Sequence, residues 1–262
     1  TDLRIDDPDE AICSDEEIDY FLHFTGHILP GIALDRSQIV FHFSGVRPLA
    51  STDEEFTGLV TREHCVQVLE PDAEHAFPVY SLVGGKWTTF RSFAEETTDR
   101  TLAFLGRARR VNTQEVAIGG GKAYPRGEKE QAAWLARLQA QTGLALPRLQ
   151  TLFERYGTRA EAVAQYIAAG ADTLLDDAPA YSERELLFLI EHEKVAHLDD
   201  LLLRRTLLAM LGMVTGGVLR QAGQIMGAAH GWSAEQIEAE IERTIDILVK
   251  RHGVREERLR AK

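Results

Sequence analysis

The chain has 262 residues, of which 44% are hydrophobic and 27% charged, a composition that excludes disordered and fibrous proteins. Its 29 Lys and Arg against 41 Asp and Glu give a formal net charge of −12 at pH 7. This balance argues against a nucleic-acid-binding protein, which needs a basic surface to neutralise phosphates. The two cysteines are too few for a disulfide framework, and no apolar run reaches the roughly 18 residues of a membrane span.

Residues 1–112 mix one clear helix start with strand-like runs. Ser14 is followed by Glu17 at the spacing of a capping box, and apolar residues at helical spacing come next. Three runs rich in β-branched and aromatic residues predict strands, the last two as an antiparallel hairpin with a long loop: 39–43, 65–69 and 79–83. A further helical pattern begins near Thr88 and continues to about Leu105.

Residues 113–127 contain a run of three glycines and few periodic apolar residues, so we interpret them as a linker. From residue 128 onward every segment has a helical pattern. Three more capping boxes mark helix starts in this half: those at Thr158, Ser182 and Ser233. We therefore expect an α+β fold, with a small mixed or antiparallel sheet part at 1–112 and an all-α bundle of about five helices at 128–262.

Two apparent motifs fail on spacing. His192 and His197 are five residues apart, which places them about 140° apart around a helix, so we expect no metal site there. The Gly-Lys pairs at 85–86 and 121–122 lack both the first glycine and the Ser or Thr of a phosphate-binding P-loop.

A strand, a glycine pair and a helix start follow one another at residues 79–91. Gly84 and Gly85 allow a ligand to approach the backbone, and the first turn of the next helix presents free N–H groups and a partial positive charge. Lys86 adds a full charge at the same place. The alternative interpretation is a tight strand–helix turn with a solvated lysine.

Two arginines also point to an anion. Arg47 stands directly after a predicted strand, between Val46 and Pro48, and Arg62 follows it by fifteen residues. Arginine binds phosphate or carboxylate with two parallel hydrogen bonds. The alternative is that both are unrelated surface arginines.

Taken in order, three motifs closely resemble the FAD-dependent glycerol-3-phosphate dehydrogenases. They are FSGVRPL at 43–49, TRE at 61–63 and VGGKWTTFR at 83–91. The acidic stretch 5–20 and the helical stretch 189–206 are also similar to that family, so the resemblance spans essentially the whole chain.

The resemblance implies oxidation of sn-glycerol 3-phosphate to dihydroxyacetone phosphate, with hydride passing to N5 of FAD and electrons leaving to quinone. Arg47 and Arg62 are then expected to hold the substrate phosphate, with Ser44 lining the pocket. A second set is expected to face the flavin: Gly84, Gly85, Lys86, Trp87 and Thr88. Lys86 and the helix N-terminus stabilise negative charge on the reduced ring, and the glycines let the backbone lie against it.

The chain departs from the family in having no dinucleotide-binding unit with a G-x-G-x-x-G fingerprint. The family's catalytic histidine lies upstream of residue 1, so we assign that role neither to His42 nor to His64. We expect this to be a C-terminal fragment that neither holds FAD nor turns over substrate by itself. The resemblance predicts a cytoplasmic location, peripheral on the inner face of the membrane for the full enzyme, and a homo-oligomer.

Two alternatives stay open. One is a glycerol-3-phosphate oxidase of the same family, which passes electrons to oxygen instead of quinone. The other is a helical interaction or oligomerisation module without catalysis, since helices are predicted for about half of the chain.

Overall fold

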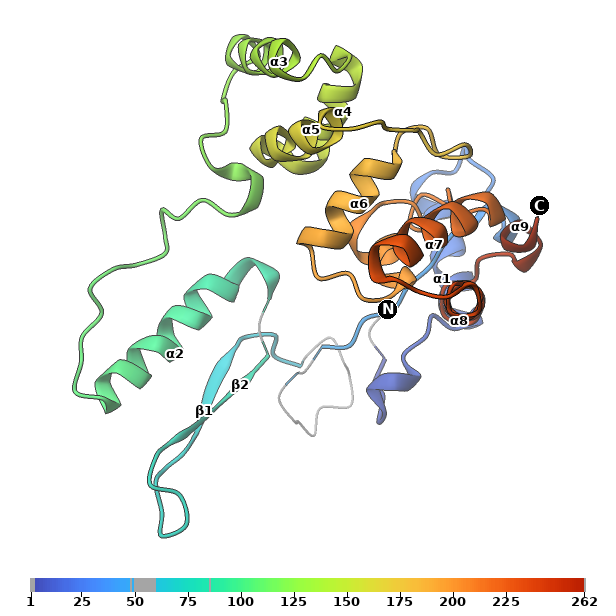
Figure 1. Ribbon diagram of the computed structural model, residues 1–262. Helices are drawn as coiled ribbons and strands as arrows, with labels where there is room; N and C mark the ends of the chain where they lie inside the picture. The colour runs from blue at the N-terminus through green and yellow to red at the C-terminus, as the bar shows by residue number, and fades with distance from the viewer. Residues whose placement is uncertain (1–2, 48, 50–59, 85, 262) are drawn as a thin grey trace. The chain divides into compact units, whose positions relative to one another are not determined.

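The computed structural model describes residues 3–47, 49, 60–84 and 86–261 (Figure 1). The chain divides into two compact units. The hairpin unit comprises residues 1–11 and 44–116, and the helical unit comprises residues 12–43 and 117–262. The mostly helical chain with a small antiparallel sheet confirms the expected α+β class. The predicted domain boundaries stay a prediction, although residues 12–43 group with the C-terminal helices and not with the hairpin.

The hairpin unit is built from strands β1 (Cys65–Leu69) and β2 (Val79–Val83), followed by helix α2 (Phe90–Phe104). The strands are antiparallel, with Cys65 opposite Val83 and Leu69 opposite Val79, which confirms the predicted hairpin. A 3₁₀ turn, η4 (Trp87–Thr89), leads into α2. Figure 1 shows α2 running alongside the hairpin.

Helix α2 covers one face of the hairpin. Phe93 is buried and stacks on His64 with ring centroids 4.3 Å apart, while the Tyr80 hydroxyl donates to the Arg100 carbonyl at 3.4 Å. On the opposite face the apolar side chains of Leu69 and Val79 are exposed. An isolated two-stranded hairpin is at best marginally stable in water, so the packing of α2 on one face contributes to the stability of this unit.

The helical unit contains most of the helices of the chain. Its α-helices are α1 (Asp15–Ile28), α3 (Glu128–Thr142), α4 (Leu146–Tyr156), α5 (Ala160–Ala168), α6 (Glu183–His192), α7 (Gly216–His230), α8 (Ala234–His252) and α9 (Glu256–Arg260). Short turns are η1 (Pro8–Glu10), in the hairpin unit, and η2 (Arg36–Gln38), η5 (Gly119–Gly121) and η6 (Gly157–Arg159); η7 (Asp200–Arg205) is a π-helical segment.

Local capping explains why several of these helices begin where they do. The predicted boxes at Ser14 and Ser233 are both formed, with reciprocal side-chain to backbone hydrogen bonds. Ser182 caps α6, but the side chain of Glu185 turns inward instead of returning to the cap. The prediction at Thr158 is wrong, because its hydroxyl hydrogen-bonds the carbonyls of Gly120 and Lys122 at 2.9 and 2.7 Å.

The predicted strand at 39–43 is also wrong. This segment lies against the end of α8 instead of pairing with another strand: the His42 N–H donates to the His252 carbonyl at 3.1 Å, and His252 Nδ1 lies 2.9 Å from the His42 carbonyl oxygen. Phe41 stacks on the His252 ring. The aromatic and β-branched residues of this segment pack an extended backbone against a helix. β-Propensity alone does not distinguish such a segment from a strand in a sheet.

The glycine run η5 packs closely on the junction of α4 and α5. A Cβ atom at Gly120 would overlap the Tyr156 carbonyl, and one at Gly157 would overlap the backbone of Gly120. Only glycines allow this approach of two backbones. Residues 117–127 are therefore part of the helical unit.

The core of the helical unit is continuous and largely leucine. Leu138, Leu152, Leu186, Leu219 and Leu248 are fully buried, on five different helices. In the part of the chain that the structure describes, no helix is both long enough and apolar enough to cross a membrane.

Candidate active site at the end of the hairpin

Two of the sequence motifs meet at one end of the hairpin. Because Cys65 pairs with Val83, the residues just before β1 and just after β2 lie side by side. Gly84 has a φ of 77°, and a Cβ atom there would lie 3.0 Å from the Glu63 carbonyl oxygen and 3.6 Å from the His64 Cα. Both the positive φ and the close approach require glycine at this position. The TRE motif, which contains Arg62, is thereby placed beside the glycine–lysine turn.

The turn after Gly84 is held by its own backbone and Thr89. The Lys86 N–H donates to Thr89 Oγ1 at 3.3 Å, and the Thr89 N–H donates to the Lys86 carbonyl at 2.9 Å. The N–H groups of Trp87 and Thr88 stand in the first helical turn, where no preceding carbonyl is available to accept them. The positive end of the helical turn and the lysine charge thus coincide.

The side chains of this turn face solvent. Lys86 and Thr88 are exposed, and Trp87 is 93% exposed, an unusual state for a large indole ring. Gly85, also predicted to face the flavin, lies outside the described residues. An exposed indole beside a lysine and open N–H groups is a surface suited to a flat, partly anionic ligand.

The predicted phosphate-binding residues are only partly brought together. Arg62 is half-buried next to the Glu63–Gly84 approach. Ser44 and Arg47 are exposed, and the Arg47 carbonyl accepts a hydrogen bond from Leu49. Among the described residues, no hydrogen bond or ion pair links the side chains of Ser44 or Arg47 to the hairpin.

The sequence of this chain is similar to a known protein family. The family model for the C-terminal domain of alpha-glycerophosphate oxidase matches residues 111–237. A glycerol-3-phosphate dehydrogenase of Synechocystis sp. is 31% identical over 258 residues, which are 93% of this chain and 44% of that protein. The aerobic glycerol-3-phosphate dehydrogenase of Escherichia coli is 29% identical over 202 residues, or 76% of this chain and 39% of its own length. The chain matches the C-terminal part of glycerol-3-phosphate dehydrogenases.

A solved glycerol-3-phosphate dehydrogenase shows the same fold. The protein from Bacillus halodurans, complexed with FAD, matches with a TM-score of 0.66 at 22% identity, over 93% of this chain and 47% of that chain. The chain therefore spans less than half the length of these relatives. The family resemblance stated from the three motifs is confirmed.

The arginine that ends the third dehydrogenase-like motif is already engaged. Arg91 Nη1 lies 2.9 Å from the Glu95 carboxylate, one turn along α2, and its hydrogen bond lowers the pKa of that carboxyl. Arg109 pairs with both Glu95 and Asp99. These ion pairs fasten the segment after α2 to the helix and leave Arg91 an unsuitable phosphate ligand.

Three histidines contact neighbouring side chains. His64 stacks on Phe93, with Nε2 3.7 Å from Glu96 Oε2. His192 stacks on Phe188 at the end of α6, whereas His197 Nδ1 lies 3.0 Å from Glu240. Within the described ranges, no group of three or more His, Cys, Asp or Glu is placed to hold a metal ion.

Proposed function

We propose that this chain is the C-terminal part of a flavoenzyme that oxidises sn-glycerol 3-phosphate to dihydroxyacetone phosphate. One observation carries the proposal: Gly84 places the TRE motif beside the glycine–lysine turn, so an anion-binding and a flavin-facing element share one end of the hairpin. The similarity to glycerol-3-phosphate dehydrogenases over nearly the whole chain supports it.

On the substrate side, Arg62 and Arg47 bind the phosphate and Ser44 lines the pocket. A guanidinium group gives two parallel, charge-assisted hydrogen bonds to phosphate oxygens, which neutral side chains do not match. In a chain of net charge −12, these arginines and Lys86 also form a local attraction for a dianionic substrate.

On the cofactor side, the observed turn fits one edge of FAD. Gly84 and Gly85 carry no side chain that would hinder close approach, the N–H groups of Trp87 and Thr88 donate, and Lys86 supplies positive charge. Bound FAD would supply the hydride acceptor for oxidation at the substrate's C2. The residues of this chain orient one edge of the ring and stabilise the negative charge that reduction brings to it.

The remainder of the cofactor needs residues that this chain does not supply. FAD's pyrophosphate is normally bound by a glycine-rich turn and a helix N-terminus, and the sequence has no such fingerprint. The catalytic base is likewise unassigned in this chain. We therefore propose that the 262 residues alone neither hold FAD nor oxidise glycerol 3-phosphate.

The electron acceptor separates two candidate activities. The relatives are named dehydrogenases, whereas the matching family model is described from an oxidase. We propose that the full-length enzyme is a dehydrogenase that passes electrons to quinone; an oxidase would pass them to oxygen. Quinone reduction against oxygen uptake by the full-length enzyme distinguishes them. The cytoplasmic location, the peripheral membrane association and the homo-oligomer stay predictions.

Arg47 offers a direct test in the full-length enzyme. We expect Arg47→Ala to raise the KM for glycerol 3-phosphate about 10- to 150-fold, because a charge-assisted hydrogen bond is lost, and to leave the weak oxidation of glycerol unchanged. Arg91→Ala is the matched control, since its guanidinium pairs with Glu95. Equal losses on both substrates would assign Arg47 to folding instead of phosphate binding.

A further inference from the structure

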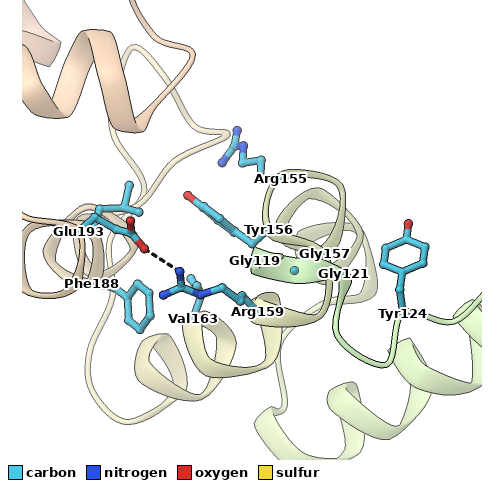
Figure 2. A pocket seen from close by; sticks show the side chains of 12 residues that line it. Gly119, Gly121, Tyr124, Arg155, Tyr156, Gly157, Arg159, Val163, Phe188 and Glu193 are labelled. Carbon is cyan, nitrogen blue, oxygen red and sulfur yellow. Dashed lines mark ion pairs between the residues drawn. The ribbon is translucent and has the colours of Figure 1, made fainter. Parts of the chain in front are cut away.

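A cavity of about 420 Å³ lies within the helical unit, and none of its lining residues is assigned above to substrate or flavin. It opens between the glycine turn η5, the junction of α4 and α5, and the C-terminal end of α6 (Figure 2). Its volume falls in the range of small-molecule sites, which begins near 300 Å³. Every lining residue belongs to one unit, so the cavity does not depend on how the two units are arranged.

Two guanidinium groups line the cavity. Arg155 is the second-last residue of α4 and Arg159 is the last residue of η6, and both are among the residues that line the cavity. Arg159 Nη1 lies 2.9 Å from Glu193 Oε1, and the Arg159 side chain is 47% exposed. Figure 2 shows Arg159 and Glu193 reaching toward one another across the opening. Because this one ion pair uses only part of the five-donor guanidinium, Arg159 has capacity for an anion that enters the cavity.

The charges around the cavity do not cancel. Among the residues that line the cavity, Arg155 and Arg159 carry positive charge and Glu193 carries negative charge. The lining therefore has an excess of one positive charge in a chain whose net charge is −12. A positive cavity in an acidic protein concentrates small anions.

The remaining walls are apolar and aromatic. Val163, Phe188 and Leu189 supply apolar surface, and the rings of Tyr124 and Tyr156 stand on the side of the glycine turn. Such walls favour a ligand with a hydrocarbon or aromatic body over a bare inorganic ion. The lining thus combines a cationic wall with an apolar one.

We propose that this cavity binds a small organic anion, a phosphate or carboxylate carried on an apolar or aromatic body. Its oxyanion takes the place of the Glu193 carboxylate on Arg159, and its body packs on Val163, Phe188 and Leu189. Glu193 acts as an internal competitor that closes the site in the free protein. Binding here is independent of the flavin, so its failure leaves the proposed dehydrogenase activity untouched.

The test is calorimetric titration of the 262-residue chain with phenyl phosphate and with benzoate. We expect at least one of them to bind, and Arg159→Gln to weaken that binding by about tenfold or more, as expected for a lost charge-assisted hydrogen bond. Glu193→Gln should tighten it, because the competing charge is removed. The opposite signs of the two variants separate a ligand effect from a folding defect.

Arg137→Gln is the matched control. Arg137 pairs with Glu161 at 2.7 Å with nearly the same side-chain exposure, 43% against 47% for Arg159, but lies outside the cavity. It should leave binding unchanged. The proposal is overturned if neither probe binds at millimolar concentration, if Arg137→Gln weakens binding as much as Arg159→Gln, or if Glu193→Gln fails to tighten it. Equal binding of phenol or of inorganic phosphate alone would also overturn it.

Discussion

The two units of the chain differ sharply in how completely they bury their side chains. In the helical unit, leucines on several helices are fully buried in one continuous core. In the hairpin unit, Val66 and Phe93 are the buried apolar residues among those that the structure describes. Yet the hairpin unit carries all the residues predicted to bind substrate and flavin. The unit proposed to contribute to the active site is therefore the one with the smaller core.

This difference follows from what each unit can pack against. The helices close a core by pairing with sequence neighbours, whereas the two strands have one covered face and two free edges within the described structure. The segments that match this chain cover 44% and 39% of the lengths of the two relatives. We infer that the hairpin unit is completed by further protein in the full-length enzyme, and that the helical unit is not.

The largest effect is expected at the buried charge cluster of the helical unit. The Glu185 carboxylate is fully buried and lies 2.5 Å from Arg148, 2.9 Å from Arg155 and 2.7 Å from the Tyr156 hydroxyl. Glu185→Gln leaves two arginines uncompensated and should cost about 3–5 kcal/mol of unfolding free energy, measured by denaturant titration. Glu161→Gln, which removes an exposed pair with Arg137, should cost less than about 1 kcal/mol. Similar losses of unfolding free energy for Glu185→Gln and Glu161→Gln would show that the buried charge cluster is no more important for stability than the Arg137–Glu161 pair.

Leucine truncation compares the two units directly. Leu152 is fully buried in α4, whereas Leu69 in β1 is 66% exposed. Leu152→Ala should cost about 2–5 kcal/mol, and Leu69→Ala less than about 0.5 kcal/mol in this chain. In the full-length enzyme, Leu69→Ala should cost more, because additional protein then covers that face. If Leu69→Ala lowers the unfolding free energy by the same small amount in the 262-residue chain and in the full-length enzyme, then no additional protein covers the hairpin face that carries Leu69.

The smallest effect concerns pH and the segment that lies on α8. Burial, and secondarily the His252 charge, lower the pKa of His42. As the pH falls below the ordinary histidine pKa of about 6.5, His42 becomes protonated in the unfolded chain before it does in the folded chain. The free energy of unfolding therefore decreases over this pH range. Denaturant titrations across this range should show less pH dependence for His42→Gln than for the original chain. Identical pH dependence in the two proteins would show that His42 does not contribute to this loss of stability.

The sequence predicts elements whose signals are local. The hairpin follows from two alternating strands around a long loop, and the starts of α1 and α8 follow from serine caps within three residues of their partners. The family and the three motifs are also readable without coordinates. The approach of Gly84 to Glu63 is implied by the predicted hairpin once its register is known.

What the sequence could not show depends on partners distant along the chain. Thr158 has the spacing of a cap, but its hydroxyl bonds residues 120 and 122. Residues 39–43 look like a strand, but their partner is His252. The cavity was missed as well, because its lining comes from three segments that are separate in the sequence: 119–124, 155–163 and 188–193.

The most direct measurement compares the purified 262-residue chain with the full-length protein for bound flavin and for oxidation of glycerol 3-phosphate with a dye acceptor. We expect a colourless, inactive chain and a yellow, active full-length protein, because the sequence has no glycine-rich fingerprint of the kind that binds the pyrophosphate of a dinucleotide. A yellow chain that turns over glycerol 3-phosphate would contradict the account, since the hairpin unit would then be complete without further protein.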